Sequence, residues 1–78
     1  MTFGEALAAA SLHGETHAEQ RPYDEGPPTP LPHELRGIFD DAKTEALISV
    51  MREAWWRHRY YSLRMKYARS QRRLEDVA

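Results

Sequence analysis

Apolar residues in the second half of the chain recur at intervals of three and four, which is the spacing of a helix face. The stretch from Lys43 to Glu75 contains no glycine or proline, and at 1.5 Å per residue it predicts a helix about 50 Å long. Residues at this spacing form a stripe along one side of a helix. The first stripe consists of Leu47, Met51, Ala54, His58, Tyr61, Met65, Ala68 and Arg72.

A second stripe has the same spacing and lies roughly 200° around the helix from the first. It consists of Trp56, Tyr60, Leu63, Tyr67, Ser70 and Leu74. A helix on the surface of a monomer has a single apolar stripe, so this amphipathic helix is predicted to pack between neighbours. Basic residues separate the two stripes, with Arg52, Arg59, Lys66 and Arg73 on one flank and Arg57 and Arg64 on the other.

The first half of this helix is predicted to be the better buried one. From Ala46 to Trp56 it is apolar almost all round, because Ile48 and Trp55 fill the sector that is charged farther on. The alternative for each Trp and Tyr is an ordinary core position, with arginine stems lying over the rings and the guanidinium groups in water.

Residues 1–14 predict a short N-terminal helix. Thr2 and Glu5 have the spacing of a capping box, and the alanine-rich stretch after them favours helix. Gly14 is a suitable C-terminal stop. The apolar residues available to cover a stripe of the long helix are Phe3, Leu7, Ala10 and Leu12.

Residues 15–32 are polar, then acidic, then rich in proline, with four of the five prolines between Pro27 and Pro32. This composition favours extended geometry, so we expect an arm or linker that can clasp a neighbour. Pro32 suits the first position of a helix. Residues 33–78 are therefore predicted to form a short helical turn, interrupted at Gly37, and then the long helix, capped by Asp40 or Asp41.

The expected fold is thus all-α, without an independent globular core. A chain of 78 residues with no cysteine has neither disulfides nor a recognisable metal site to supplement a small core. Association into an oligomer or a larger hetero-complex is the remaining way to bury the apolar surface.

The charge is strongly asymmetric although the net charge is only −1. Residues 1–42 have two basic and eight acidic side chains, whereas residues 43–78 have nine basic and four acidic ones. Between Arg57 and Arg73 there are seven Arg and Lys residues and no acid. The candidate contacts for an anion or nucleic acid are Arg52, Arg57, Arg59, Arg64, Lys66, Arg69, Arg72 and Arg73.

Three kinds of target suit this basic block. Its cations can contact phosphates while Tyr60 or Tyr67 stacks on bases, or they can face an acidic protein groove. The third target is an anionic membrane surface. It is disfavoured, because the basic residues flank two apolar stripes and do not gather opposite a single one. Nucleic-acid binding is disfavoured by the acidic first half of the chain, which would repel phosphates unless it folds away or is neutralised by the helix.

Nothing in the sequence has the pattern of a catalytic or cofactor site. There is no nucleophile with a base at a recognisable spacing, no glycine-rich phosphate loop and no convincing carboxylate pair. His13 and His17 are four residues apart, but no third ligand accompanies them, so we expect solvated histidines and no metal. His58 is predicted to be an interface residue that can make assembly sensitive to pH near neutrality. We therefore expect no enzymatic activity, no cofactor and no small-molecule substrate.

Neither a signal peptide nor a transmembrane segment is evident, which leaves the cytoplasm or an assembled particle as the expected location. The first hypothesis is a structural or assembly subunit, such as a small protein of a virion or another multi-subunit particle. The alternatives are a nucleic-acid-binding accessory protein and a small inhibitor or adaptor that docks one helix in a groove. The predicted protein interface consists of Leu47, Met51, Trp55, Trp56, Tyr60, Tyr61, Leu63, Met65 and Tyr67.

Overall fold

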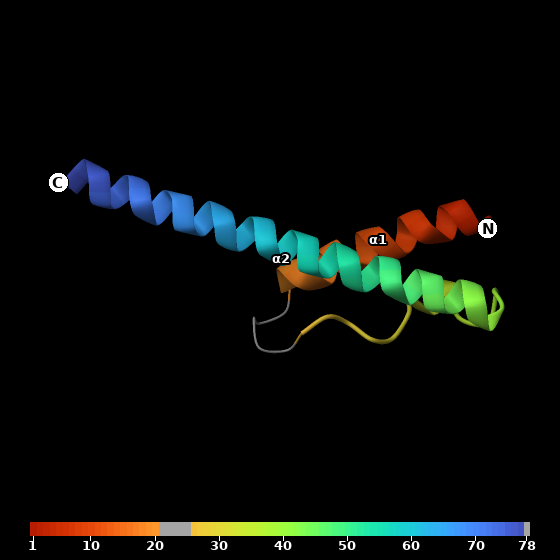
Figure 1. Ribbon diagram of the computed structural model, residues 1–78. Helices are drawn as coiled ribbons and strands as arrows, with labels where there is room; N and C mark the ends of the chain where they lie inside the picture. The colour runs from red at the N-terminus through yellow and green to blue at the C-terminus, as the bar shows by residue number, and fades with distance from the viewer. Residues whose placement is uncertain (21–25, 78) are drawn as a thin grey trace.

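Two α-helices make up most of the chain (Figure 1). The computed structural model describes residues 1–20 and 26–77, and in these residues the elements are α1 (Phe3–Gln20), the 3-10 turn η1 (His33–Leu35) and α2 (Asp41–Val77), with no strand. The helices run in the same direction, because residues 26–40 lead back along the pair to the N-terminal end of α1. We call residues 26–32 the return segment. The expectation of an all-α chain is confirmed.

Helix α1 begins where the capping box predicts. The Thr2 Oγ1 accepts a hydrogen bond of 3.1 Å from the Glu5 backbone N–H, and the Thr2 carbonyl accepts one of 3.0 Å from the Ala6 N–H. The Thr2 hydroxyl also donates to the Glu5 carboxylate at 3.1 Å. Thr2 therefore satisfies one of the N–H groups that the first turn of a helix leaves unpaired.

The end of α1 differs from the sequence expectation, because the helix passes Gly14 and continues to Gln20. Gly14 is buried against α2, and a side chain at this position would collide with the Met51 carbonyl oxygen. The glycine is thus a point of close helix approach and not a stop. The Thr16 hydroxyl, which donates to the Leu12 carbonyl at 2.9 Å, lies within the extra turns.

The face that α1 turns toward α2 is made of small residues. Ala6, Ala10, Gly14 and Ala18 are all buried and follow one another every four residues. Because side chains four apart lie on one helix face and these are the smallest available, the backbones can approach closely. Leu12, which the sequence offered for this contact, is instead 65% exposed.

The core lies between α1, η1 and the first half of α2. Its fully buried members include Leu35, Leu47 and Met51, and Leu31 packs against them. At the N-terminal end, the rings of Phe3 and Phe39 meet edge to face with 5.7 Å between centroids. This arrangement adds to the stabilisation that burial of the rings provides.

The return segment before η1 lies against the same core. Pro28 is fully buried and Leu31 is half-buried, while residues 15–20 belong to α1. An extended arm over residues 15–32 is therefore not confirmed; its residues 21–25 lie outside the described part of the chain. The short turn predicted after Pro32 is present as η1, in which the Leu35 N–H donates to the Pro32 carbonyl at 3.0 Å.

Helix α2 starts at the predicted cap. The Asp40 Oδ1 accepts a hydrogen bond of 2.9 Å from the Lys43 N–H, and the Asp40 carbonyl accepts one of 2.9 Å from the Thr44 N–H. Gly37, three residues earlier, has a φ of +75°, a conformation that residues with a Cβ rarely adopt. From Asp41 the helix is unbroken to Val77, which confirms the long helix read from the spacing.

The molecule is elongated, with principal extents of 57, 23 and 17 Å. Its accessible surface is 5889 Å², whereas a compact chain of this size exposes about 4,900 Å². Most of the elongation comes from α2, which continues far beyond the end of α1 (Figure 1).

Candidate functional site

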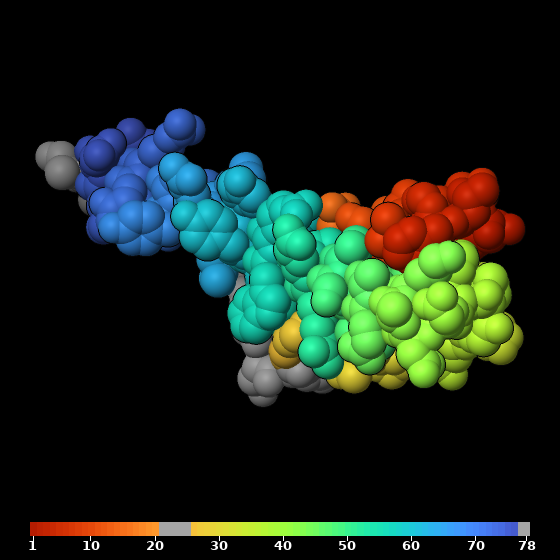
Figure 2. Space-filling model, turned by 45° about the vertical axis from the view of Figure 1, so that its right-hand side comes forward, coloured from red at the N-terminus to blue at the C-terminus, as the bar shows by residue number. Residues whose placement is uncertain are grey.

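The second half of α2 extends past the rest of the molecule (Figure 2), and it is a single helix (Figure 1). Near the end of α1, the Glu19 Oε1 lies 3.5 Å from the His58 Nε2. Beyond this contact α2 has residues 60–77, which correspond to about 27 Å of helix. We call residues 60–77 the projecting half.

The interface residues predicted from the sequence divide into two groups. Leu47, Met51 and Trp55 are 0%, 0% and 2% exposed. They are therefore core residues of this chain. Leu47 and Met51 pack with α1 and η1 on the side of α2 that the sequence assigned to a neighbour, and Arg59 lies over the Trp55 ring. The side chains that remain more than half exposed are Trp56, Tyr60, Tyr61, Leu63, Met65 and Tyr67.

Five of the exposed apolar residues form a continuous stripe along α2. They follow one another at intervals of four, three, four and seven, so they share one face of the helix. Their exposures lie between 51% and 67%. We call this stripe the seam; it consists of Trp56, Tyr60, Leu63, Tyr67 and Leu74.

The other side of the projecting half has a shorter apolar strip, made of Tyr61 and Met65. It continues the line of Leu47 and Met51 beyond the end of α1, and both residues are more than half exposed. The rings of Tyr60 and Tyr61 meet edge to face with 5.5 Å between centroids, so the two strips touch at this point. Exposed apolar surface of this extent on a small chain is typical of a binding surface.

The basic residues predicted to contact an anion are mostly on the surface, with one clear exception. Arg59 is only 7% exposed, and its guanidinium carbon lies 5.2 Å from the centre of the Trp55 ring. It therefore covers the core tryptophan and is not available as a surface anion contact. Seven remain exposed: Arg52, Arg57, Arg64, Lys66, Arg69, Arg72 and Arg73.

Acidic side chains are absent from the sequence between Arg57 and Arg73. The Arg57 guanidinium donates a hydrogen bond of 2.7 Å to the Glu53 carboxylate, which lies four residues and one helical turn earlier. Both side chains are more than half exposed, so this pair contributes little to stability. The positive charge of the projecting half is consequently concentrated beside its apolar strips, where it can attract an acidic partner.

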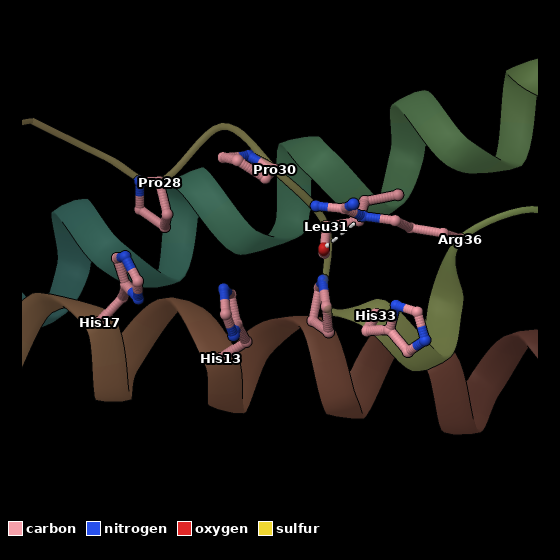
Figure 3. Close-up of a pocket in the computed structure, with 8 residues that line it drawn as sticks. His13, His17, Pro28, Pro30, Leu31, His33 and Arg36 are labelled. Carbon is pink, nitrogen blue, oxygen red and sulfur yellow. Dashed lines mark hydrogen bonds between the residues drawn. The ribbon is translucent and has the colours of Figure 1, made fainter.

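A small cavity lies between the second half of α1 and the segment that leads to η1 (Figure 3). It has a volume of about 240 Å³. The Arg36 Nε donates a hydrogen bond of 3.2 Å to the Leu31 carbonyl beside it. His13 and His17 point from α1 toward the return segment, with 5.0 Å between their ring centroids. The lining residues are His13, His17, Pro28, Pro30, Leu31, Pro32, His33 and Arg36.

The sequence did not predict this cavity, because His13 and His17 were expected to be solvated side chains. The only signal for it was their spacing of four, which places both on one face of a helix. Among residues 1–20 and 26–77, no group of three or more histidines, cysteines or carboxylates is placed to hold a metal ion.

Comparison with known proteins gave no match: no protein-family model, no curated protein and no solved structure is similar to the chain. In the part of the chain that the structure describes, neither helix combines the length and the apolar content that crossing a bilayer requires.

Proposed function

We propose that the chain is a non-enzymatic structural or assembly subunit, which joins a larger complex by binding neighbouring proteins through the exposed strips of α2. The observation that carries the proposal is the seam, whose five apolar side chains are each more than half exposed along a helix that extends past the rest of the chain. Burial of such side chains is worth about 1.5–3 kcal/mol each, so a partner that covers them gains substantial binding free energy.

The chain exposes more surface than a compact chain of its size, by an amount comparable to one side of a protein interface. The accessible area exceeds that of a compact chain of this size by about 1,000 Å², and one side of a standard protein interface buries about 800 Å². The helices α1 and η1 provide the anchor, because they cover the first half of α2 and leave the second half to project. The return segment has no part in the proposal, since Pro28 and Leu31 pack on their own chain.

The proposal predicts that three polar substitutions in the seam abolish association without unfolding the chain. In the variant Tyr60→Ser, Leu63→Ser, Tyr67→Ser, no fully buried side chain is lost. The measurement is crosslinking with mass spectrometry on complexes isolated from the cells that make the protein. Wild type should give crosslinks between the projecting half and a neighbouring protein, and the variant should lose at least about nine-tenths of them.

Leu12→Ser is the matched control, because Leu12 is 65% exposed on α1 and lies away from the seam. It should retain the crosslinks of wild type. If wild type is recovered as a folded monomer with no crosslink from the projecting half, the chain is not an assembly subunit of this kind. Crosslinks that survive in the triple variant would place the interface elsewhere on the chain.

A second candidate function, nucleic-acid binding, is favoured by one observation: the basic block from Arg57 to Arg73 contains no acid and has exposed tyrosines within it. Phosphate contacts and base stacking would then share one helix. Its signature is an affinity that falls by roughly three to five decades between 50 and 200 mM salt. An affinity that does not change with salt would exclude it.

A further inference from the structure

The seam has the spacing of a coiled-coil interface. With Tyr60 and Tyr67 at the a positions of a heptad, Trp56 and Leu63 fall at d, and Leu74 is the next a residue after the small Ser70. From Trp56 to Leu74 the seam is about 27 Å long, and all five of its apolar side chains are more than half exposed. A helix of similar length laid along it can cover the whole stripe.

The positions on either side of the seam carry only positive or neutral side chains. In the same heptad, the e positions are Arg57, Arg64 and Gln71, and the g positions beyond the buried Arg59 are Lys66 and Arg73. Residues at e and g face the partner helix and decide which partner and which orientation is accepted. The flanks therefore select for negative charge on the other helix.

The seam of a second copy is a poor occupant of the seam of the first. In a parallel pair each e position faces a g position of the other copy, and in an antiparallel pair e faces e and g faces g. In either arrangement, Arg64, Lys66 and Arg73 would each lie opposite a basic or neutral residue of the other copy. Like charges at these positions disfavour pairing.

Nucleic acid also fits the seam less well than a protein helix does. Phosphates and base edges are polar, so a groove that received this face of α2 would bring Leu63 and Leu74 against polar groups and gain nothing from their burial. A helix with its own apolar stripe covers these side chains and meets the basic flanks at the same time.

We propose that the partner bound by the seam is an amphipathic helix of another protein, with apolar residues along its centre and Asp or Glu on both edges. This inference rests on the proposed function and specifies the partner. The helix lies along α2 from Trp56 to Leu74, with its acidic residues opposite Arg57, Arg64, Lys66 and Arg73.

The test uses the full chain and three labelled synthetic helices of about 21 residues, or three heptads. All three have Leu and Ile at the central positions, and they differ only in having Glu, Gln or Lys at every e and g position. Fluorescence anisotropy at nanomolar peptide gives the dissociation constants. The Glu peptide should bind at least about tenfold more tightly than the Gln peptide, and the Lys peptide should bind more weakly than either.

Charge reversal provides the matched control. In the variant Arg64→Glu, Arg73→Glu both changed residues are exposed, so the fold should be retained. This variant should weaken the Glu peptide by about tenfold or more and strengthen the Lys peptide. The triple seam variant should bind none of the peptides, which shows that charge alone does not account for the affinity.

Equal affinities for the Glu and Gln peptides would overturn the inference while leaving the proposed function intact, because the seam would then bind helices without regard to charge. Binding of a single-stranded oligonucleotide with a steep salt dependence, together with no binding of the Glu peptide, would assign the seam to nucleic acid. Self-association that is lost in the triple seam variant would assign it to a second copy. Each of these results contradicts an acidic helix as the partner.

Discussion

Replacing the buried Trp55 with alanine is expected to unfold most of the chain, whereas the same change at its exposed neighbour Trp56 is expected to leave the fold intact. The two tryptophans are adjacent in the sequence and their rings meet edge to face with 4.8 Å between centroids. Trp55 is 2% exposed and Trp56 is 59% exposed. The pair therefore isolates the effect of burial at constant side-chain chemistry.

The expected loss for Trp55→Ala is about 3–5 kcal/mol, the range for a large aromatic removed from a core. A core in a chain of this length supplies no more than about 3–5 kcal/mol in total, so the variant should be largely unfolded at room temperature. The substitution also removes the stacking surface of Arg59, which lies over the Trp55 ring. For Trp56→Ala we expect a change within about 0.5 kcal/mol.

Urea unfolding followed by circular dichroism at 222 nm measures both variants. A third variant, Trp55→Phe, keeps most of the ring volume and removes the Nε1–H, which has no hydrogen-bond acceptor among residues 1–20 and 26–77. Because an unsatisfied buried donor is itself costly, this variant should be clearly more stable than Trp55→Ala. If Trp55→Ala and Trp56→Ala had equal midpoints, the difference in burial between the two tryptophans would be wrong.

The second large effect is expected at Gly14, where alanine should destabilise the fold even though alanine is the better helix former. A Cβ at Gly14 would collide with the Met51 carbonyl oxygen and lie only 3.0 Å from the Met51 carbonyl carbon and 3.1 Å from the Ala54 Cβ. Backbone atoms cannot rotate away as a flexible side chain can, so the two helices would have to move apart.

Overpacking of this kind costs about 1–3 kcal/mol, and the separation of the helices also loosens Ala10 and Ala18 on the same face. The gain in helix propensity is about 1 kcal/mol and does not compensate. Gly4→Ala is the control within the same helix, since the nearest atom to its Cβ would be the Thr2 Oγ1 at 4.0 Å. It should be neutral or stabilising by up to about 1 kcal/mol.

Thermal unfolding followed by circular dichroism compares the two glycine variants directly. A lowered midpoint for Gly14→Ala with an unchanged or raised midpoint for Gly4→Ala is the expected pattern. Stabilisation by both substitutions would show that α1 does not approach α2 closely at Gly14.

The long helix could be predicted well from the sequence, because its signals are local. The absence of glycine and proline from Lys43 to Glu75 and the cap at Asp40 both depend on residues near one another in the chain. The extent of α1 could not be predicted in this way. Gly14 was interpreted as a helix stop, which is its usual local meaning, but its role here depends on Met51, which is distant in the sequence.

The division of the first stripe was missed for the same reason. Leu47 and Met51 lie on the same line as Tyr61 and Met65, and nothing in that line indicates where a covering helix ends. The missing signal was the face of α1 that is made of small residues. Ala6, Ala10, Gly14 and Ala18 are small enough for the backbone of α2 to approach closely. Alanine and glycine at this spacing are weak hydrophobic signals, so the sequence left open whether the N-terminal helix or a neighbouring molecule covers Leu47 and Met51.

The central claim is that the first half of α2 completes a small core and the second half binds a partner helix along the seam. Amide hydrogen exchange of the full chain, measured with and without the Glu peptide, tests it most directly. We expect amides of residues 60–74 to exchange at least about tenfold more slowly with the peptide, while the already protected amides of residues 47–55 change little. Unchanged exchange in residues 60–74, or slowing confined to α1 and the first half of α2, would contradict it.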